Sequence, residues 1–197
     1  MEHIIRRYKL EQGALEVEYI EECFTEFSGK KRAEEIVNRL KDREHLILLS
    51  MAACGDDDGT LIPVSYKIGH ELRAQEAGIK LADLVGQLRD VVEFENRKIF
   101  YSWIGGTRQE WRGHGHYRAL TEQQEEWAHA SGYHELVVKT KNRFYGMRAT
   151  LDHLNFDVIK FQRHLRDNRE SKVYMSKKIA ADVLHQHQTT RSVVEAA

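Results

Sequence analysis

The segment IGGTRQEWRGHGHYRAL, from Ile104 to Leu120, constrains the fold of this chain more than any other stretch. It reads as the end of a strand, a basic turn that carries glycines, and the N-terminus of a helix. Glycines let the backbone approach an anion, consecutive N–H groups point at it, and the helix dipole adds roughly half a positive charge. The side chains of Arg112 and Arg118 can add charge of the same sign. The segment therefore predicts a strand, a phosphate-binding turn and a helix.

Other interpretations of this turn fit the residues less well. It lacks the lysine of a GxxxxGK[ST] P-loop, and GHGHYR does not have the GxGxxG spacing of a dinucleotide fingerprint. His114 and His116 form an HxH pair, but no third ligand stands near them in the sequence. His185 and His187, in the C-terminal tail, are a still weaker pair. We therefore predict no metal site.

The composition excludes several classes of protein. Thirty basic residues stand against thirty-one acidic ones, which leaves a formal charge of −1 and no electrostatic footprint for nucleic acid. The opening MEHIIRRYKL is too short and too charged for a signal peptide, and no apolar run approaches the roughly 20 residues that cross a bilayer. We expect a cytoplasmic protein without membrane contact, with one domain over residues 1–179 and a tail over 180–197.

The two cysteines give no sign of a disulfide or zinc framework. Cys23 and Cys54 lie in apolar surroundings and have no CxxC spacing. We expect both to be buried thiols in a reducing compartment.

Hydrophobic periodicity and turn residues predict strands and helices in mixed order. The expected strands cover residues 3–10, 45–54, 61–72, 98–106, 134–140, 156–165 and 171–179. The expected helices cover 16–27, 30–42, 117–132 and 144–156. This order predicts an α/β fold of the α+β type, with a mixed, mostly antiparallel sheet covered by helices rather than a doubly wound Rossmann domain.

Several local features complete this prediction. GDDDG at 55–59 has turn chemistry, and Asn142 is a plausible N-cap for the helix over 144–156. The polar segment 73–96 contains IKLADLVGQLRDVVEF, whose periodicity fits a helix interrupted at Gly86. We interpret this segment as an insertion, either a surface elaboration or a lid over a substrate site. Its acidic residues either favour a cationic amine or form a solvated face: Asp83, Asp90, Glu93 and Glu95.

Two motifs resemble those of the GNAT superfamily of N-acetyltransferases. RGHGHYRAL resembles the [QR]xxGx[GA] turn that binds the pyrophosphate of acetyl-CoA in that family. HELVVKTKNRFYGMRATLDHLNF is similar to the second family motif, a strand, a helix and a turn that ends in Phe. The resemblance covers roughly residues 4–179. It implies a GNAT-like fold and an acyl-CoA-dependent acetyltransferase with acetyl-CoA as the acyl donor.

The resemblance also implies which residues contact this co-substrate, mostly through the backbone. The pyrophosphate turn comprises Arg112, Gly113, His114, Gly115, His116 and Tyr117. Gly105, Gly106 and Thr107 offer the edge of their strand to the pantetheine arm, and Asn142 lies beside it at the start of its helix. By default the run from Lys139 to Arg143 is a solvated loop, although its position also suits the 3′-phosphate of CoA.

The chain departs from the family pattern at two positions. Tyr117 stands where Gly or Ala is usual, which implies either an altered turn or a ring directed away from the phosphates. Leu151 stands where many members carry a tyrosine that protonates the departing thiolate. Tyr145 is a loose replacement for that acid, since six residues place it well round the helix from Leu151.

The base is equally open. Tyr101 falls where some members place a glutamate, and period-two alternation puts it on one face of its strand with Trp103 and Gly105. Because a tyrosine has an ordinary pKa of about 10, we expect Tyr101 to line the site rather than to act as the base, or to be a core aromatic. His70 and Glu71 are the alternative bases.

The resemblance implies direct transfer of an acetyl group to a primary amine, with a small molecule or a peptide as the acceptor. The alternative is a catalytically silent acyl-CoA-binding or regulatory module that has lost the acid at Leu151. A third interpretation is a structural protein with a chance glycine turn. Family habit suggests a homodimer formed through the last strands or the tail.

Overall fold

The computed structural model describes residues 4–10, 14–27, 29, 31–53 and 60–180. The elements within this part of the chain are β1 (Ile4–Tyr8), α1 (Ala14–Cys23), α2 (Ala33–Leu40), β2 (His45–Ala53), β3 (Leu61–Leu72), α3 (Ile79–Leu88), β4 (Ile99–Thr107), α4 (His116–Ala130), β5 (Glu135–Lys141), α5 (Tyr145–His153), β6 (Asp157–Gln162) and β7 (Lys172–Lys178), with the 3₁₀ turns η2 (Gln109–Trp111) and η3 (Asn168–Glu170). The predicted turn at 55–59, Cys54 and the tail beyond Ala180 lie outside the described residues.

The strands pair in the order β1-β2-β3-β4-β5-β7-β6. β1 with β2, β2 with β3, β5 with β7 and β6 with β7 are antiparallel, whereas β4 and β5 are parallel. The parallel pairing joins only Ile99–Ser102 to Glu135–Val138. This arrangement confirms the predicted mixed, mostly antiparallel sheet.

The chain divides into two compact units. Unit 1 holds the described residues of Met1–His70 and Trp103–Thr121, and unit 2 holds those of Glu71–Ser102 and Glu122–Ala197. β4 therefore passes from unit 2 into unit 1 after Ser102, and α4 returns to unit 2 after Thr121.

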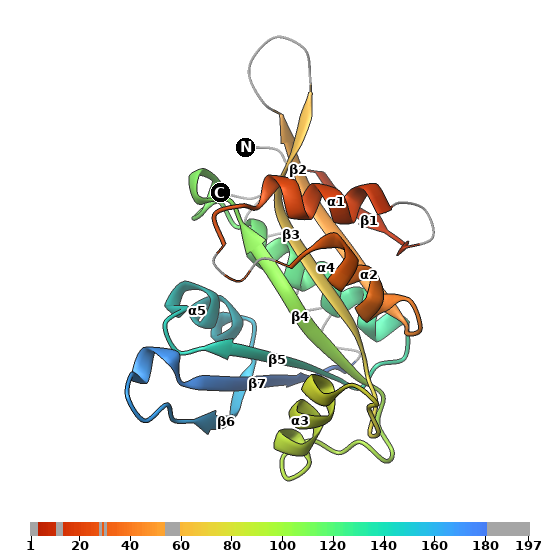
Figure 1. The fold of residues 1–197 in the computed structure, drawn as a ribbon, viewed down its shortest axis with the longest axis vertical. Coiled ribbons are helices and arrows are strands. Elements are labelled where there is room, and N and C mark those ends of the chain that lie inside the picture. Colours follow the sequence, from red (N-terminus) through yellow and green to blue (C-terminus); the bar gives the residue numbers. More distant parts are fainter. Residues whose placement is uncertain (1–3, 11–13, 28, 30, 54–59, 181–197) are drawn as a thin grey trace. The chain divides into compact units, whose positions relative to one another are not determined.

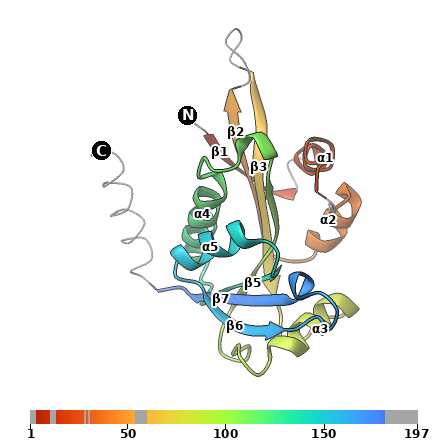
Figure 2. The same ribbon diagram turned by 90° about the vertical axis from the view of Figure 1, so that its left-hand side faces the viewer.

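In unit 1, α1 and α2 lie side by side on one face of β1–β3, and the start of α4 lies on the other face (Figures 1 and 2). The i, i+3, i+4 spacing of apolar residues in both helices directs a stripe to the sheet. The resulting core contains Val17, Ile20, Phe24, Ile36, Leu40, Ile47, Leu49, Met51, Tyr66 and Ile68. Cys23 lies at its margin and is half-buried, not fully buried as predicted, and this burial raises the pKa of its thiol.

In unit 2, α5 lies on one face of the β5-β7-β6 sheet and α3 on the other (Figure 2). The predicted interruption at Gly86 is wrong, because α3 runs unbroken from Ile79 to Leu88. A glycine inside a helix costs only about 1 kcal/mol relative to alanine, and four apolar side chains of α3 are buried. These side chains are Leu81, Leu84, Val85 and Leu88. Packing therefore outweighs the local preference at Gly86.

Candidate active site

The predicted phosphate turn, Arg112–Tyr117, lies in unit 1 and is called the glycine turn below. Gly113 and Gly115 have φ values of +83° and +79°, in the left-handed region where L side chains are strained. A Cβ at either position would have no atom within 4 Å, and residues 112–115 are exposed to solvent. α4 begins at His116, and Ala119 N donates to Gly115 O at 2.9 Å. The first N–H groups of a helix have no intrahelical acceptor, so the turn is a site suited to an anion.

Tyr117 is the second residue of α4 and directs its ring away from the exposed turn. Its hydroxyl accepts a hydrogen bond from Lys67 Nζ at 3.2 Å, and that ammonium lies 4.2 Å from the ring centroid. Burial raises the pKa of Tyr117, so the hydroxyl stays neutral. Of the two expectations for Tyr117, the structure has the ring directed away.

His116 anchors the start of α4 from the inside. Its ring is buried, Nδ1 lies 3.0 Å from Ser50 Oγ of β2, and Trp111 packs edge-on at 5.8 Å between centroids. The neighbouring His114 is exposed. His116 is therefore a packed residue, and any role of its position toward an anion belongs to the backbone.

The side chain of Arg112 does not add free charge to the turn, which corrects the sequence expectation. Arg112 Nε donates to Thr107 O at 3.1 Å, and a terminal nitrogen pairs with Glu26 at 3.0 Å. The guanidinium also lies 5.7 Å from the Phe27 ring centroid. Arg112 thus fastens the turn to the segment after α1, since its charge is already paired.

The two glycines of β4 are required by close packing in unit 1. A Cβ at Gly105 would lie 3.0 Å from Tyr66 O, and one at Gly106 would lie 2.7 Å from the Phe27 ring. Thr107 Oγ1 is 2.8 Å from Ser65 Oγ, and Ser65 Oγ donates to Gly106 O at 3.0 Å. The glycines therefore have a structural reason that is independent of any ligand.

The predicted common face of Trp103 and Gly105 is wrong. Trp103 packs against His70 at 5.7 Å, whereas a Cβ at Gly105 would approach the side chain of Lys67 at 3.6 Å. His70 and Lys67 are three residues apart on β3, so their side chains leave opposite faces of the strand. The alternation along β4 is interrupted between Trp103 and Gly105.

The four candidate catalytic residues have different environments. His70 is 0% exposed in unit 1, and Tyr101, opposite Val137 in unit 2, is also buried. Glu71 pairs with Arg73 at 2.8 Å. Tyr145 is 61% exposed at the first residue of α5, whereas Leu151 is 0% exposed, as the six-residue spacing predicts. Buried groups reach an acceptor only after a rearrangement, so Glu71 and Tyr145 are the more accessible candidates.

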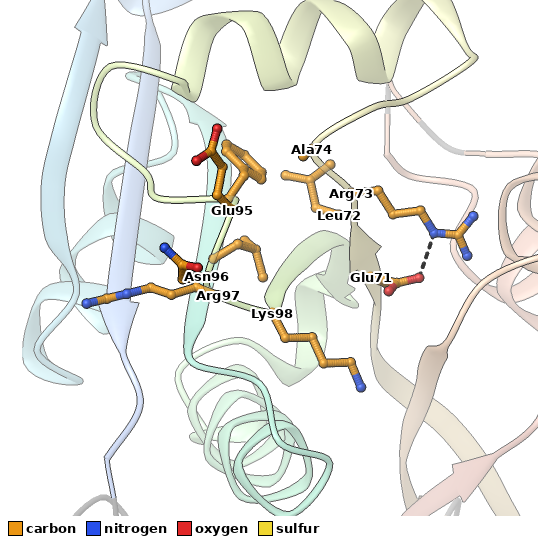
Figure 3. A pocket seen from close by; sticks show the side chains of 10 residues that line it. Glu71, Leu72, Arg73, Ala74, Glu95, Asn96, Arg97 and Lys98 are labelled. Carbon is orange, nitrogen blue, oxygen red and sulfur yellow. Dashed lines mark hydrogen bonds and ion pairs between the residues drawn. The ribbon is translucent and has the colours of Figure 1, made fainter.

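Glu71 also lines a cavity that the sequence did not indicate. The cavity lies in unit 2 between the end of β3 and the segment that enters β4, and its volume is about 440 Å³. Figure 3 shows Glu71 and Arg73 turned toward each other at its edge. Its lining residues are Glu71, Leu72, Arg73, Ala74, Phe94, Glu95, Asn96, Arg97, Lys98 and Ile99.

The turn between β5 and α5 is held by side chains of unit 2. Asn142 is not the N-cap, which is Phe144, because the Asn142 amide is used elsewhere. Its Nδ2 donates to Asn168 O at 3.1 Å, and its Oδ1 accepts from Arg148. Lys141 and Arg143 each approach Glu170 at 2.6 Å. The cations of this turn are thus engaged by the η3 segment, as in a structural loop.

The insertion helix α3 is fixed to the sheet of unit 2. Lys160 Nζ of β6 donates to Gln87 O at 2.6 Å and to Asp90 at 2.9 Å. Glu93 pairs with Arg97 at 3.2 Å. Two of the four acidic residues considered for a cationic amine are therefore paired with the chain's own cations, while Asp83 and Glu95 are exposed. This packing favours a surface elaboration.

Sequence reasoning missed Lys67 and Ser50, which contact Tyr117 and His116 of the glycine turn. Both are buried, and both lie on strands that are otherwise mostly apolar. A lysine in the middle of LIPVSYKIGHEL was the available signal, because lysine is almost never fully buried without a partner.

Comparison with known proteins establishes the fold. No protein-family model and no curated protein matches the chain. Among solved structures, it is similar to NAA60 of Arabidopsis thaliana in complex with acetyl-CoA, with 10% identity, a TM-score of 0.68, and coverage of 90% of this chain and 99% of that one. It is also similar to a chain of the NatC complex bound to Gag peptide and CoA, with 12% identity, a TM-score of 0.65 and coverage of 91% and 100%.

A third similar solved structure is described as a member of the GNAT family. It is the acetyltransferase of the GNAT family from Streptococcus pneumoniae, with 14% identity, a TM-score of 0.57 and coverage of 91% and 100%. The protein therefore has the GNAT fold, as the two sequence motifs imply.

Two further observations concern only the described residues. None of their helices is both long and apolar enough to cross a membrane. Among the same residues, no group of three or more His, Cys, Asp or Glu side chains is placed to hold a metal ion.

Proposed function

We propose that this protein is an N-acetyltransferase that moves an acetyl group from acetyl-CoA to a primary amine. The observation that carries the proposal is the glycine turn at the start of α4, in a chain with the GNAT fold. The similar structures of NAA60 and NatC contain acetyl-CoA and CoA, respectively, which supports the same donor here.

The residues of the glycine turn fit a diphosphate. Gly113 and Gly115 leave open space in front of the backbone, and α4 starts directly behind them. In the proposal, the backbone N–H groups of Arg112–Tyr117 bind the pyrophosphate. Gly105, Gly106 and Thr107 provide the strand edge for the pantetheine arm, and Asn142 remains a proposed neighbour in unit 2.

Acetyl-CoA supplies the thioester carbonyl that the acceptor amine attacks. The chain's contribution is to hold donor and amine together, which in favourable cases lowers the barrier by about 7 to 11 kcal/mol. A backbone N–H directed at the developing oxyanion lowers it further. We propose Glu71 or His70 as the base, Tyr101 as a residue that lines the site, and Tyr145 as the acid.

The acceptor is proposed only by class. The NatC structure contains a Gag peptide, which favours a peptide amine over a small molecule. A homodimer, a cytoplasmic location and the absence of nucleic-acid partners stay predictions from the sequence.

A second candidate is a catalytically silent acyl-CoA-binding module. It is favoured by Leu151, which is fully buried and cannot protonate a thiolate. The two candidates differ in turnover, since only the enzyme releases free CoA thiol at a rate that saturates with an amine.

Calorimetry with acetyl-CoA tests the donor site in the intact chain and in Gly115→Glu. The added carboxylate should occupy and repel the phosphate position, so binding should be lost. Gly86→Glu is the matched control, because Gly86 is exposed on α3 and a Cβ there meets nothing within 4 Å. If the intact chain does not bind acetyl-CoA, the proposal is wrong. If it binds, thiol release with a panel of peptide and small amines separates the enzyme from the silent module.

A further inference from the structure

Lys67 is an unusual residue for the middle of a strand. It lies in β3 of unit 1 and is 1% exposed, although an ammonium is costly to bury without compensation. Tyr117 supplies compensation in two ways, because its hydroxyl accepts a hydrogen bond from Nζ and its ring centroid lies 4.2 Å from the same atom.

The position of this pair links Lys67 to the glycine turn. Tyr117 is the second residue of α4, so the ammonium contacts a side chain that the first turn of that helix carries. The stem of Lys67 also faces Gly105, where a Cβ would come within 3.6 Å of Lys67 Cγ. Lys67 therefore touches both elements of unit 1 that the proposed function assigns to the donor.

We propose that Lys67 is a positioning residue for a diphosphate ligand at the glycine turn. Its ammonium holds Tyr117, and with it the first turn of α4, and adds a buried positive charge behind the backbone N–H groups. Tyr117 and Lys67 act as a pair, because a small residue at position 117 would have no hydroxyl or ring to contact the ammonium. The inference rests on the proposed function, because it concerns the same donor site.

Electrostatics favours this role. The helix dipole acts only within the first turn, and Lys67 contacts the side chain of a residue in that turn. At physiological ionic strength, salt screens exposed charges over a Debye length of about 8 Å. A buried charge is screened less. The ammonium should thus attract an anion through the turn without touching it.

If Lys67 only stabilises the fold, its replacement should weaken the binding of charged and uncharged ligands equally. If its charge serves the ligand, its replacement should weaken only the binding of ligands that carry the diphosphate. Calorimetry should compare acetyl-CoA, inorganic pyrophosphate and acetyl-pantetheine, which lacks the diphosphate. Lys67→Met keeps the length of the side chain and removes its charge, whereas Lys67→Arg keeps the charge. Lys41→Met is the matched control, because it removes one charge from the exposed end of α2 in the same unit.

We expect Lys67→Met to weaken the binding of acetyl-CoA and pyrophosphate by roughly tenfold. The salt dependence of their binding should change little, because salt screens a buried charge only weakly. Binding of acetyl-pantetheine should stay within about twofold, and Lys67→Arg should recover most of the affinity for the two diphosphates. Lys41→Met should match the intact chain.

Each other outcome has a definite meaning. Unchanged diphosphate binding in folded Lys67→Met overturns this inference and leaves the proposed function standing. An equal loss for acetyl-pantetheine, or an equal loss in Lys67→Arg, also overturns it, because charge is then not the cause. If Lys67→Met does not fold, Tyr117→Phe replaces it, and its diphosphate affinity should fall by about two- to threefold; an unchanged value contradicts the pairing. Absence of acetyl-CoA binding in the intact chain overturns the proposed function itself.

Discussion

Two strands of this protein run through a short turn into a helix, and the two turns use their polar groups in opposite ways. Between β4 and α4, two glycines at positive φ leave an exposed backbone in front of a helix N-terminus. Between β5 and α5, Asn142 N donates to Ser171 O and Arg143 N donates to Arg169 O, each at 2.8 or 2.9 Å. These backbone N–H groups of the second turn therefore donate to acceptors within unit 2.

This difference shows why the same strand, turn and helix pattern does not by itself make an anion site. Charged and amide side chains in the second turn attract internal partners, and Glu170 takes both Lys141 and Arg143. Glycines in the first turn have no side chains to form such bonds.

Replacing Gly115 with valine should remove the function of the first turn. A β-branched residue at φ +79° is strained by about 1–3 kcal/mol, so the backbone must move. We expect acetyl-CoA affinity to fall on the order of 100-fold, about 2.7 kcal/mol, in calorimetry. Native affinity in folded Gly115→Val would show that the turn does not hold the ligand.

Replacing Asn142 with alanine should damage stability more than binding. The change removes the hydrogen bond to Asn168 O and leaves Arg148 without its Oδ1 acceptor. We expect a loss of about 1–3 kcal/mol in the free energy of unfolding from denaturant titration. Acetyl-CoA affinity should stay within about threefold, on the order of one weak contact. A loss of affinity much larger than threefold would contradict this mainly structural role of Asn142.

Gly146→Ala, in the first turn of α5, should be the harmless counterpart of Gly115→Val. Gly146 is helical, has no positive φ, and a Cβ there meets nothing within 4 Å. Alanine should stabilise the protein by about 0.4–1 kcal/mol, because it reduces the entropy of the unfolded chain. Destabilisation in a thermal melt would contradict this account of the α5 turn.

Glu170→Gln should produce the smallest effect, and one that depends on pH. The hydrogen bond from Lys141, together with the charge of Arg143, lowers the pKa of Glu170. Because the pKa of Glu170 is lower in the folded state than its ordinary value of about 4.3, its ionised form stabilises the fold at pH values above about 4.3. This stability is lost as the pH falls through the folded-state pKa. The intact chain should therefore melt slightly above Glu170→Gln at pH 7 and equal it in strong acid. A constant difference across this range would exclude the ionised carboxylate as the cause.

Sequence patterns predicted an element correctly where the spacing of apolar residues matches the face that the element buries. The stripe of Ile36 and Leu40 gave α2, and the apolar run from Leu46 gave a strand buried on both faces. The predictions were wrong where contacts with residues distant in the sequence determine the local structure. Gly86 does not interrupt α3, since buried neighbours outweigh its preference, and Asn142 does not cap α5, since Asn168 and Arg148 use its amide.

Local patterns are sufficient to predict the element order, the glycine turn and the resemblance to GNAT acetyltransferases, because periodicity and glycine placement act over a few residues. Contacts between distant segments pair Arg112 with Glu26, bring the Tyr117 ring against Lys67 and bury Leu151, and no local pattern predicts them. These facts depend on contacts between segments up to 86 residues apart in the chain. The energy of such contacts depends on burial and pairing, which the identity of a single residue does not specify.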